Sequence, residues 1–143
     1  MKHLLFFMSL CIAFVGCSEG DDNQRPTSSN CDMNVVLSNA QFQNAPADQI
    51  SIDELIIDGD CLKISFSSSG CDGNSWEVKL IDSETIAESF PPQRDIRLSL
   101  RNIEVCQAII SKEISFDISN LQVDGNQVFL NIANNGARIL YEY

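Results

Sequence analysis

The cysteines have the most distinctive chemistry in this sequence, and there are six of them. No two have the Cys-x-x-Cys spacing of a zinc ligand pair or a dithiol redox centre. The only histidine, His3, lies at the very start of the chain. Without its leading segment the chain has no imidazole, which excludes histidine-dependent triads, Cys–His dyads and His-ligated zinc or iron.

The leading segment has the pattern of an export signal. Met1–His3 is a short basic start, and residues 4–15 are apolar except for Ser9. A helix of twelve residues is about 18 Å long, too short for a hydrocarbon core of about 30 Å. A basic start, a short apolar run and small residues at its end are typical of a cleaved secretory signal, which we place at residues 1–16.

The end of this segment, Phe14-Val15-Gly16-Cys17, resembles the lipobox of bacterial lipoproteins, in which a small residue precedes an invariant cysteine. The resemblance implies that Cys17 receives a diacylglyceryl group, that the signal is cleaved before it, and that the new N-terminus is acylated. Phe14 departs from the leucine usual at its place. One acyl chain holds a protein to a membrane weakly, so the three chains implied for Cys17 would give stable attachment.

A polar tether follows the lipidated cysteine. Residues 18–30, "SEGDDNQRPTSSN", have the composition of a disordered linker. Their acidic first part, Ser18 to Asp22, resembles the tether of Bacteroidota-type outer-membrane lipoproteins. The resemblance implies display at the cell surface, with the periplasmic leaflet as the alternative. The whole chain therefore resembles the short uncharacterised lipoproteins of this type, with the membrane as a partner through the lipid on Cys17.

The charge of the chain excludes one class of partner. There are 20 acidic residues against 9 Lys and Arg, and loss of Lys2 with the signal leaves 8 basic groups, a net charge of about −12. A protein that binds nucleic acid needs a basic footprint, so nucleic acid is not an expected partner. Docking by charge on an anionic lipid surface is excluded for the same reason.

Apolar residues alternate with polar ones through residues 31–143, which we expect to form one domain. Turn-forming residues separate the alternating runs, at 58–60, 70–74, 91–92, 124–126 and 134–136. Seven to nine short strands with this spacing predict an all-β fold. We favour an antiparallel Greek-key sandwich of immunoglobulin or fibronectin type, with a small β-barrel as the alternative. The alternating apolar sets are Leu62, Ile64, Phe66; Trp76, Val78, Leu80; Ile96, Leu98, Leu100; Ile114, Phe116, Ile118; Val128, Leu130, Ile132; and Ile139, Tyr141, Tyr143.

Three further segments complete the expected elements. Residues 35–39 and 50–57 are expected to be strands. Residues 101–114 could form a helix, but a set at even positions favours a long strand that runs on to Ile118 and is bent near Ser111-Lys112. Only Lys112 interrupts this set, which is Cys106, Ala108, Ile110, Ile114, Phe116 and Ile118. Helix is expected only as a turn near residues 47–50 or 83–88.

Four cysteines remain for the domain, and in an exported protein this even number predicts two disulfides. A Cys61–Cys71 bond is discounted, because the strand between them holds their Cα atoms about 16 Å apart. Cys106 shares the parity of inward-facing residues and Cys61 that of outward-facing ones, so a bond between these two is awkward. The remaining pairing is Cys31–Cys61 with Cys71–Cys106, each bond worth about 4 kcal/mol.

The side chains that are candidates for ligand contact also have structural interpretations. Trp76 alternates with Val78 and Leu80, which predicts a core position, with a ligand platform as the alternative. Tyr141 and Tyr143 are expected on one face of the last strand, with sugar stacking as the alternative.

Two groups of charged residues are also candidate sites. Arg94, at the end of the proline-rich residues 89–95, and Arg97, just after them, form a candidate basic spot for a carboxylate or sulfate, with local charge pairing as the alternative. Asp72, Asn74 and Glu77 are only a fragment of a calcium loop, so no metal and no other cofactor is predicted.

No motif in the sequence indicates an enzyme. There is no Gly-x-Ser-x-Gly, no P-loop and no Gly-rich dinucleotide loop, and nothing singles out two of the twenty acids for glycoside hydrolysis. We therefore expect a non-enzymatic, lipid-anchored binding module at the bacterial outer membrane, with a protein or glycan partner. The alternative is a lysozyme or protease inhibitor, because small disulfide-braced β domains on lipid tethers resemble lysozyme inhibitors. However, residues 67–74 lack the tyrosine of such inhibitory loops.

Overall fold

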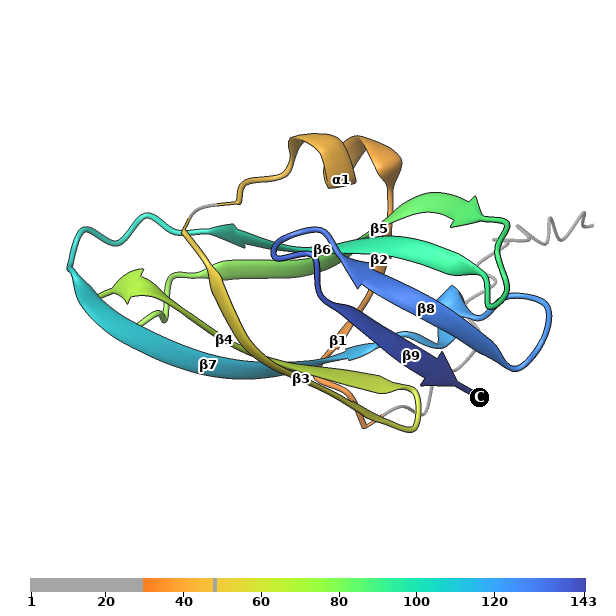
Figure 1. Ribbon diagram of the computed structural model, residues 1–143. Helices are drawn as coiled ribbons and strands as arrows, with labels where there is room; N and C mark the ends of the chain where they lie inside the picture. Colours follow the sequence, from red (N-terminus) through yellow and green to blue (C-terminus); the bar gives the residue numbers. More distant parts are fainter. Residues whose placement is uncertain (1–29, 48) are drawn as a thin grey trace, which may run out of the picture.

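The computed structural model describes residues 30–47 and 49–143, so the expected signal, Cys17 and residues 18–29 of the expected tether lie outside the described residues. The described chain forms two β-sheets that face each other (Figure 1). Among the described residues, no helix is long and apolar enough to cross a membrane. The elements in chain order are β1 (Met33–Asn34), β2 (Val36–Leu37), α1 (Asn39–Asn44), β3 (Ser51–Asp58), β4 (Cys61–Gly70), β5 (Glu77–Ala87), β6 (Gln93–Arg101), β7 (Ala108–Asp117), the 3-10 helix η1 (Ser119–Leu121), β8 (Gln127–Ile132) and β9 (Arg138–Glu142).

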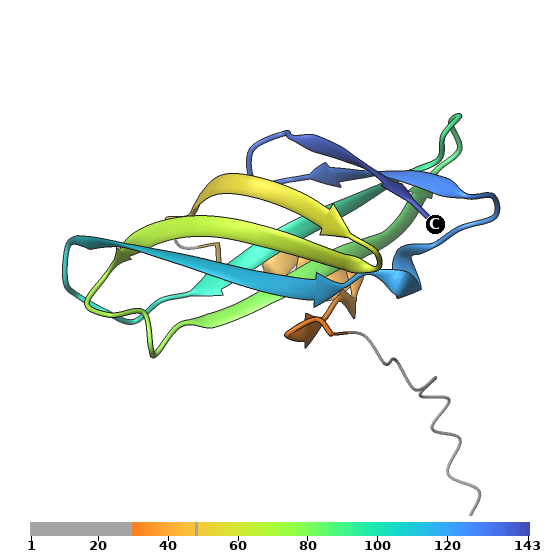
Figure 2. The same ribbon diagram turned by 90° about the horizontal axis from the view of Figure 1, so that it is seen from below.

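One sheet has the strand order β1-β7-β4-β3 and the other β2-β5-β6-β8-β9. Figure 2 looks onto the sheet that contains β3, β4 and β7. The described strands thus form two separate sheets, as in a sandwich, and not the single closed sheet of the alternative small barrel. Both sheets are mixed, because β1–β7, β2–β5 and β6–β8 are parallel pairs. The expectation of a purely antiparallel sandwich is therefore wrong: β7, in the opposite sheet, is the crossover that lets β8 run parallel to β6.

The core lies between the sheets and follows the alternation seen in the sequence. The inward residues of β4, β6 and β8 are all buried, and Leu62, Ile64 and Phe66 have no exposed surface. Most polar residues of the same strands point outward, as a half-solvated sheet requires, whereas Ser68 and Arg94 are buried with the inward set. The two-residue period therefore predicts the inner faces correctly for the central strands.

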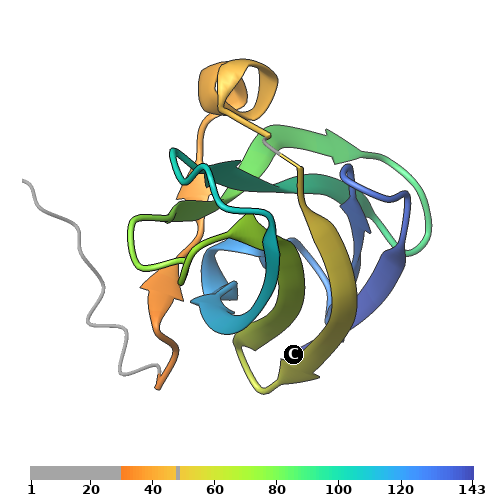
Figure 3. The same cartoon turned by 90° about the vertical axis from the view of Figure 1, so that its left-hand side faces the viewer.

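The segment before β3 differs from the expected strand at 35–39. Two short strands pair with different sheets, and helix α1 follows them on the outside of the layers (Figure 3). Ser38 caps this helix, because its hydroxyl accepts a hydrogen bond from the Gln41 N–H at 3.3 Å. None of the helix residues is buried, so no apolar periodicity marks it in the sequence. The helical turns expected near 47–50 and 83–88 are wrong: Ala47 forms a bridge with Leu100, and residues 83–87 belong to β5.

The long strand expected from residue 101 to 118 is interrupted. β6 ends at Arg101, residues 102–107 form an arch between the sheets, and β7 begins at Ala108. The arch is tied to the end of β4, because the Asn102 amide donates to the Ser69 carbonyl at 2.6 Å and Cys106 is bonded to Cys71. In Figure 1 this arch is at the left-hand end, opposite the C-terminus.

Both disulfides have the pairing expected from the sequence. Cys31 is bonded to Cys61 with a Cα–Cα distance of 5.6 Å, and Cys71 to Cys106 with 4.9 Å. The expected inward orientation of Cys106 is wrong, because the arch has left the sheet and this residue is exposed.

Candidate functional site

The sandwich has two partly open strand edges that lie next to each other. β1 pairs with β7 only at Phe116 and Asp117, and β2 pairs with β5 only at Ile81 and Asp82. In the described part of the chain, no strand pairs with the outer edge of β7 over residues 108–114 or of β5 over residues 77–80. Backbone groups along these stretches are therefore available to a partner.

Between the two open edges is a hollow of about 360 Å³, which we call the edge groove. Its floor is apolar, and charged side chains stand around it. The lining residues are Met33, Trp76, Glu77, Val78, Lys79, Lys112 and Ile114. An apolar floor with a few charged groups is the usual composition of a binding site.

Trp76 connects this groove to the core. Its ring packs against Phe66, with 6.1 Å between ring centroids, and the Lys112 ammonium lies 5.4 Å from the indole centroid. The second contact is a cation–π interaction. The indole Nε1 is buried and has no hydrogen-bond partner among the described residues. The core position expected for Trp76 and the alternative of a ligand platform are therefore compatible, since the half-buried ring serves both surfaces.

A half-buried carboxylate organises the loop beside Trp76. Glu104, in the arch, accepts hydrogen bonds at Oε2 from the backbone N–H groups of Cys71 at 2.6 Å and Gly73 at 3.1 Å. Its Oε1 accepts from the Ser75 hydroxyl at 2.9 Å. Successive backbone N–H groups that surround one anion form a nest, and here the protein supplies its own anion. This loop is thus held closed across the Cys71–Cys106 disulfide.

The nest changes both the acidity of Glu104 and the residues allowed around it. Burial raises the pKa of this carboxyl, but the hydrogen bonds from Cys71, Gly73 and Ser75 outweigh that effect and lower the pKa to about 2. A Cβ atom at Gly70 would lie 2.5 Å from Glu104 Oε2 and 3.0 Å from Trp76 Cζ2, so a larger residue here would require the side chain of Glu104 or Trp76 to shift.

The low pKa of Glu104 makes stability depend on pH. Because the pKa is lower in the folded state than the ordinary 4.5, the ionised carboxylate stabilises the fold above that value and loses its effect as the pH falls toward 2. We expect the free energy of unfolding to fall more steeply between about pH 5 and pH 2 for the wild type than for Glu104→Gln. Urea unfolding at several pH values measures this, and parallel pH profiles for the two proteins would contradict it.

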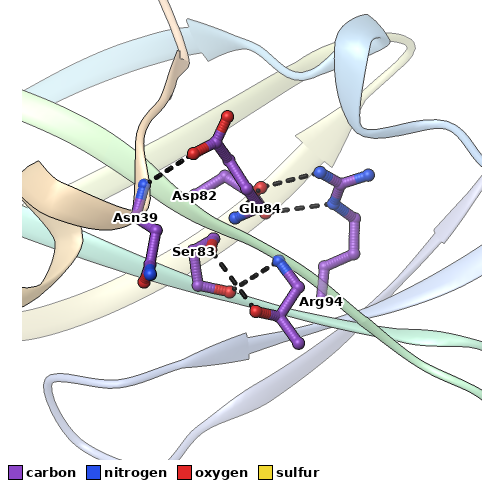
Figure 4. A network of polar contacts seen from close by, with 6 residues as sticks. Asn39, Asp82, Ser83, Glu84 and Arg94 are labelled. Carbon is purple, nitrogen blue, oxygen red and sulfur yellow. Dashed lines mark hydrogen bonds and ion pairs between the residues drawn. The ribbon is translucent and has the colours of Figure 1, made fainter.

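The expected basic spot at Arg94 and Arg97 is not a free anion site. Arg94 is buried and pairs with both carboxylate oxygens of Asp82, at 3.0 Å from Nε and 2.7 Å from Nη2 (Figure 4). Arg97 donates to the carbonyls of Phe42 and Ala45 at 2.5 and 2.6 Å, at the end of α1. Arg94 therefore has the local charge pairing that is the alternative from the sequence, whereas Arg97 is held by backbone carbonyls.

Asp82 also organises an irregular part of β5. The register between β5 and β6 shifts after Asp82, and Glu84 has a positive φ of 59°. The Asp82 carboxylate accepts the Glu84 N–H at 2.8 Å, and the Glu84 carboxylate accepts the Asn39 N–H at 2.8 Å (Figure 4). The Asp82–Arg94 pair thus fixes the backbone where the sheet edge bends toward α1.

The remaining candidates have structural roles. Tyr141 is fully buried, and burial together with the Asp60 hydrogen bond raises the pKa of its hydroxyl. Tyr143, just after β9, exchanges hydrogen bonds with the backbone of Val123 and packs against the core. Asp72 accepts the Asn74 N–H at 2.8 Å, and Glu77 pairs with Arg101 at 3.4 Å.

A second hollow, of about 300 Å³, lies between α1 and the outer face of β5 and β6. Gln41, Asn44, Ser99 and Arg101 contribute polar groups to it. Glu77 and Lys79 border both hollows, so the two lie on either side of the β5 edge.

Sequence reasoning missed Met33, Lys112 and Ile114 as parts of one site, and it missed Glu104. Met33 and Lys112 line the same hollow because β1 pairs with β7, which joins segments more than seventy positions apart in sequence. The local signal for Glu104 was the turn-rich stretch from Gly70 to Ser75, whose free N–H groups require an acceptor.

No protein-family model matches this sequence, and no curated protein is similar enough to match. The fold resembles a crystal structure of a protein described as toxin-related from Parabacteroides distasonis, with a TM-score of 0.54 and 16% identity over 78% of this chain and 60% of that one. A protein of unknown function from Bacteroides vulgatus has a TM-score of 0.49 and 14% identity over 78% of this chain and 55% of the other. The chain therefore spans only 55–60% of the length of these structures, and the first of them shows a similarity of fold alone.

Proposed function

We propose that this chain is a non-enzymatic, lipid-anchored binding module at the bacterial outer membrane, and that it holds a protein partner in the edge groove. The observation that carries the proposal is the groove itself, where a half-buried Trp76 lies between two open strand edges. Its Nε1 has no hydrogen-bond partner in residues 30–47 and 49–143. Anchorage rests on the resemblance of Phe14–Cys17 to a lipobox and of Ser18–Asp22 to an acidic tether.

The finer topology is part of the proposal. A Greek-key sandwich of immunoglobulin or fibronectin type is supported by β3, β4 and β7, which lie in one sheet while β5 and β8 lie in the other. The parallel pairing of β6 with β8 departs from that pattern. The type we propose is therefore a variant in which β6, and not β5, lies next to β8 in the second sheet.

Cys17→Ala tests the anchor. We expect the wild-type chain to remain with the outer membrane after salt washing, because three acyl chains hold it, and the variant to move to the soluble fraction. Fractionation of cells that make each form measures this. Membrane retention of the variant equal to that of the wild type would contradict the anchor.

The same cells test the groove. A photo-reactive residue in place of Met33, which lines the groove and is 39% exposed, should give a discrete adduct with a partner protein. The matched control is the same substitution at Ile56, which is 44% exposed on the other edge strand of that sheet, β3. Equal adducts from both positions, or none from Met33, would overturn the groove as the binding surface.

A further inference from the structure

We propose that the partner enters the edge groove as an extended peptide that adds a strand to the open edge of β7. This inference rests on the proposed function and gives its mode of binding. The peptide has an apolar side chain and a carboxylate two residues apart on its groove-facing side. Strand addition of this kind uses main-chain hydrogen bonds for affinity and alternate side chains for specificity.

The β7 edge already accepts a strand at one end. The Asp117 carbonyl accepts the Val35 N–H at 3.1 Å, and the Ser115 N–H donates to the Asp32 carboxylate at 2.8 Å. Both bonds are made on the side of β7 that faces away from β4. The N–H and C=O of one residue point to the same side of a strand, and this side alternates along it, so odd-numbered residues of β7 face outward.

This outward direction continues along the uncovered part of the strand. The register between β4 and β7 runs without a shift from Asp117 to Ala108. Ile109, Ser111 and Glu113 therefore present their backbone groups on the same side as Ser115 and Asp117. These three residues supply the main-chain bonds that an added strand would use.

The described N-terminal part of the chain does not cover this edge. Cys31 is bonded to Cys61, the first residue of β4, and β4 lies on the opposite side of β7 from β1. The chain at Cys31 is therefore directed toward β4 and does not run along the open edge of β7.

The other edge of the same sheet is blunted in the ways that prevent strand pairing. β3 has an irregular register between Ile52 and Glu54, and Asp53 and Glu54 stand at that place. The open stretch of β7 has no such irregularity, and the first residue whose backbone faces outward there is Ile109, which is 73% exposed. Val105 in the adjoining arch is 91% exposed. A bulge and acidic residues protect an edge, whereas a regular edge beside exposed aliphatic side chains favours an added strand.

The charges in the groove select the side chains of the peptide. Lys79 and Lys112 line the groove, and Glu77, the one acid among its described lining residues, pairs with Arg101. A lysine ammonium has three donors, and Lys112 uses one on the Gly73 carbonyl. In a chain with a net charge of −11 this is a local excess of positive charge, complementary to a carboxylate.

A second copy of the chain fits the groove less well. The even-numbered residues of β7 face the opposite way from Ser111, so another β7 strand would present Ile110, Lys112 and Ile114 to the groove. It would bring one Lys112 toward another and would offer no carboxylate at these positions. We therefore assign the site to a peptide segment of a different protein.

The test uses the chain purified from membranes in detergent and the synthetic peptide Ser-Val-Thr-Glu-Thr-Val-Ser with blocked ends. At saturating peptide, we expect hydrogen exchange at the amides of Ile109, Ser111 and Glu113 to slow at least about tenfold by NMR. The amides of β3 should not change. In a control peptide, proline replaces the two threonines on either side of the glutamate. This peptide cannot form the strand and should leave exchange unchanged.

A charge exchange tests the selected side chain. Lys112→Glu should reverse the preference, binding a peptide with Lys in place of Glu about fivefold more tightly than the original. An unchanged amide spectrum elsewhere in Lys112→Glu shows that the fold is kept, and Lys112→Gln provides a neutral intermediate.

Three results would overturn strand addition: unchanged exchange at the three β7 amides with peptide at millimolar concentration, equal slowing by the proline peptide, or a dimer whose β7 amides are protected without peptide. If adducts from the Met33 position persist in any of these cases, the groove remains the binding surface and only its mode of use is wrong. If neither the slowed exchange at the β7 amides nor the adducts from the Met33 position are observed, the proposed function is wrong as well.

Discussion

Replacing Arg94 by methionine is expected to lower the free energy of unfolding by about 3–5 kcal/mol. The side chains of Arg94 and Asp82 are 7% and 0% exposed, and two hydrogen bonds join them. Without the guanidinium, the Asp82 carboxylate would stay buried with no opposite charge. Urea unfolding followed by the fluorescence of Trp76, the only tryptophan, measures the loss.

Two controls separate the buried charge from the loss of a side chain. Arg94→Met combined with Asp82→Leu removes both charges and should recover much of the stability, because a well-packed apolar pair often replaces a buried ion pair at little cost. Arg101→Met breaks the exposed pair with Glu77, whose side chains are 59% and 63% exposed, and should cost less than about 1 kcal/mol. Equal losses for Arg94→Met and Arg101→Met would contradict the importance of the buried pair.

The central strands and their inner faces could be predicted from the sequence, because alternation is a local property. Leu62, Ile64 and Phe66 alternate with polar residues, and one sheet face buries them. The same reasoning failed at Cys106, which keeps the parity of a strand although the chain there has left the sheet. The arch is fixed by Glu104 and Asn102 contacting residues about thirty positions away, and no local period reports such contacts.

The site was less accessible to sequence reasoning than the fold. Trp76 could be identified as a candidate because it is the only residue of its type, but its neighbours in the groove depend on the order of strands in two sheets. For Arg94 the sequence was misleading, because its place next to prolines suggested a charge at the surface. Arg94 is instead buried against Asp82, which stands where the register between β5 and β6 shifts. Strand alternation specifies faces, whereas edges and ion pairs depend on long-range order.

Replacing both Cys71 and Cys106 by serine is expected to lower the free energy of unfolding by about 4 kcal/mol, the chain-entropy value for a loop of this size. The bond joins residues 35 apart and holds the arch against the end of β4. A typical domain has a net stability of about 5–15 kcal/mol, so this loss is a large part of the total. Urea unfolding of the oxidised wild type and the double variant measures it.

The other disulfide supplies the matched control, because Cys31–Cys61 joins residues 30 apart and is therefore worth nearly the same in the chain-entropy model. The two double variants should lose similar stability but differ at the groove. Without Cys71–Cys106 the nest around Glu104 loses its covalent support, and the excess pH dependence that this carboxylate gives the wild type should diminish. Without Cys31–Cys61 that pH dependence should remain. If both variants kept it, the hydrogen bonds of Glu104 alone would hold the loop beside Trp76, and the disulfide would stabilise the chain without shaping the edge groove.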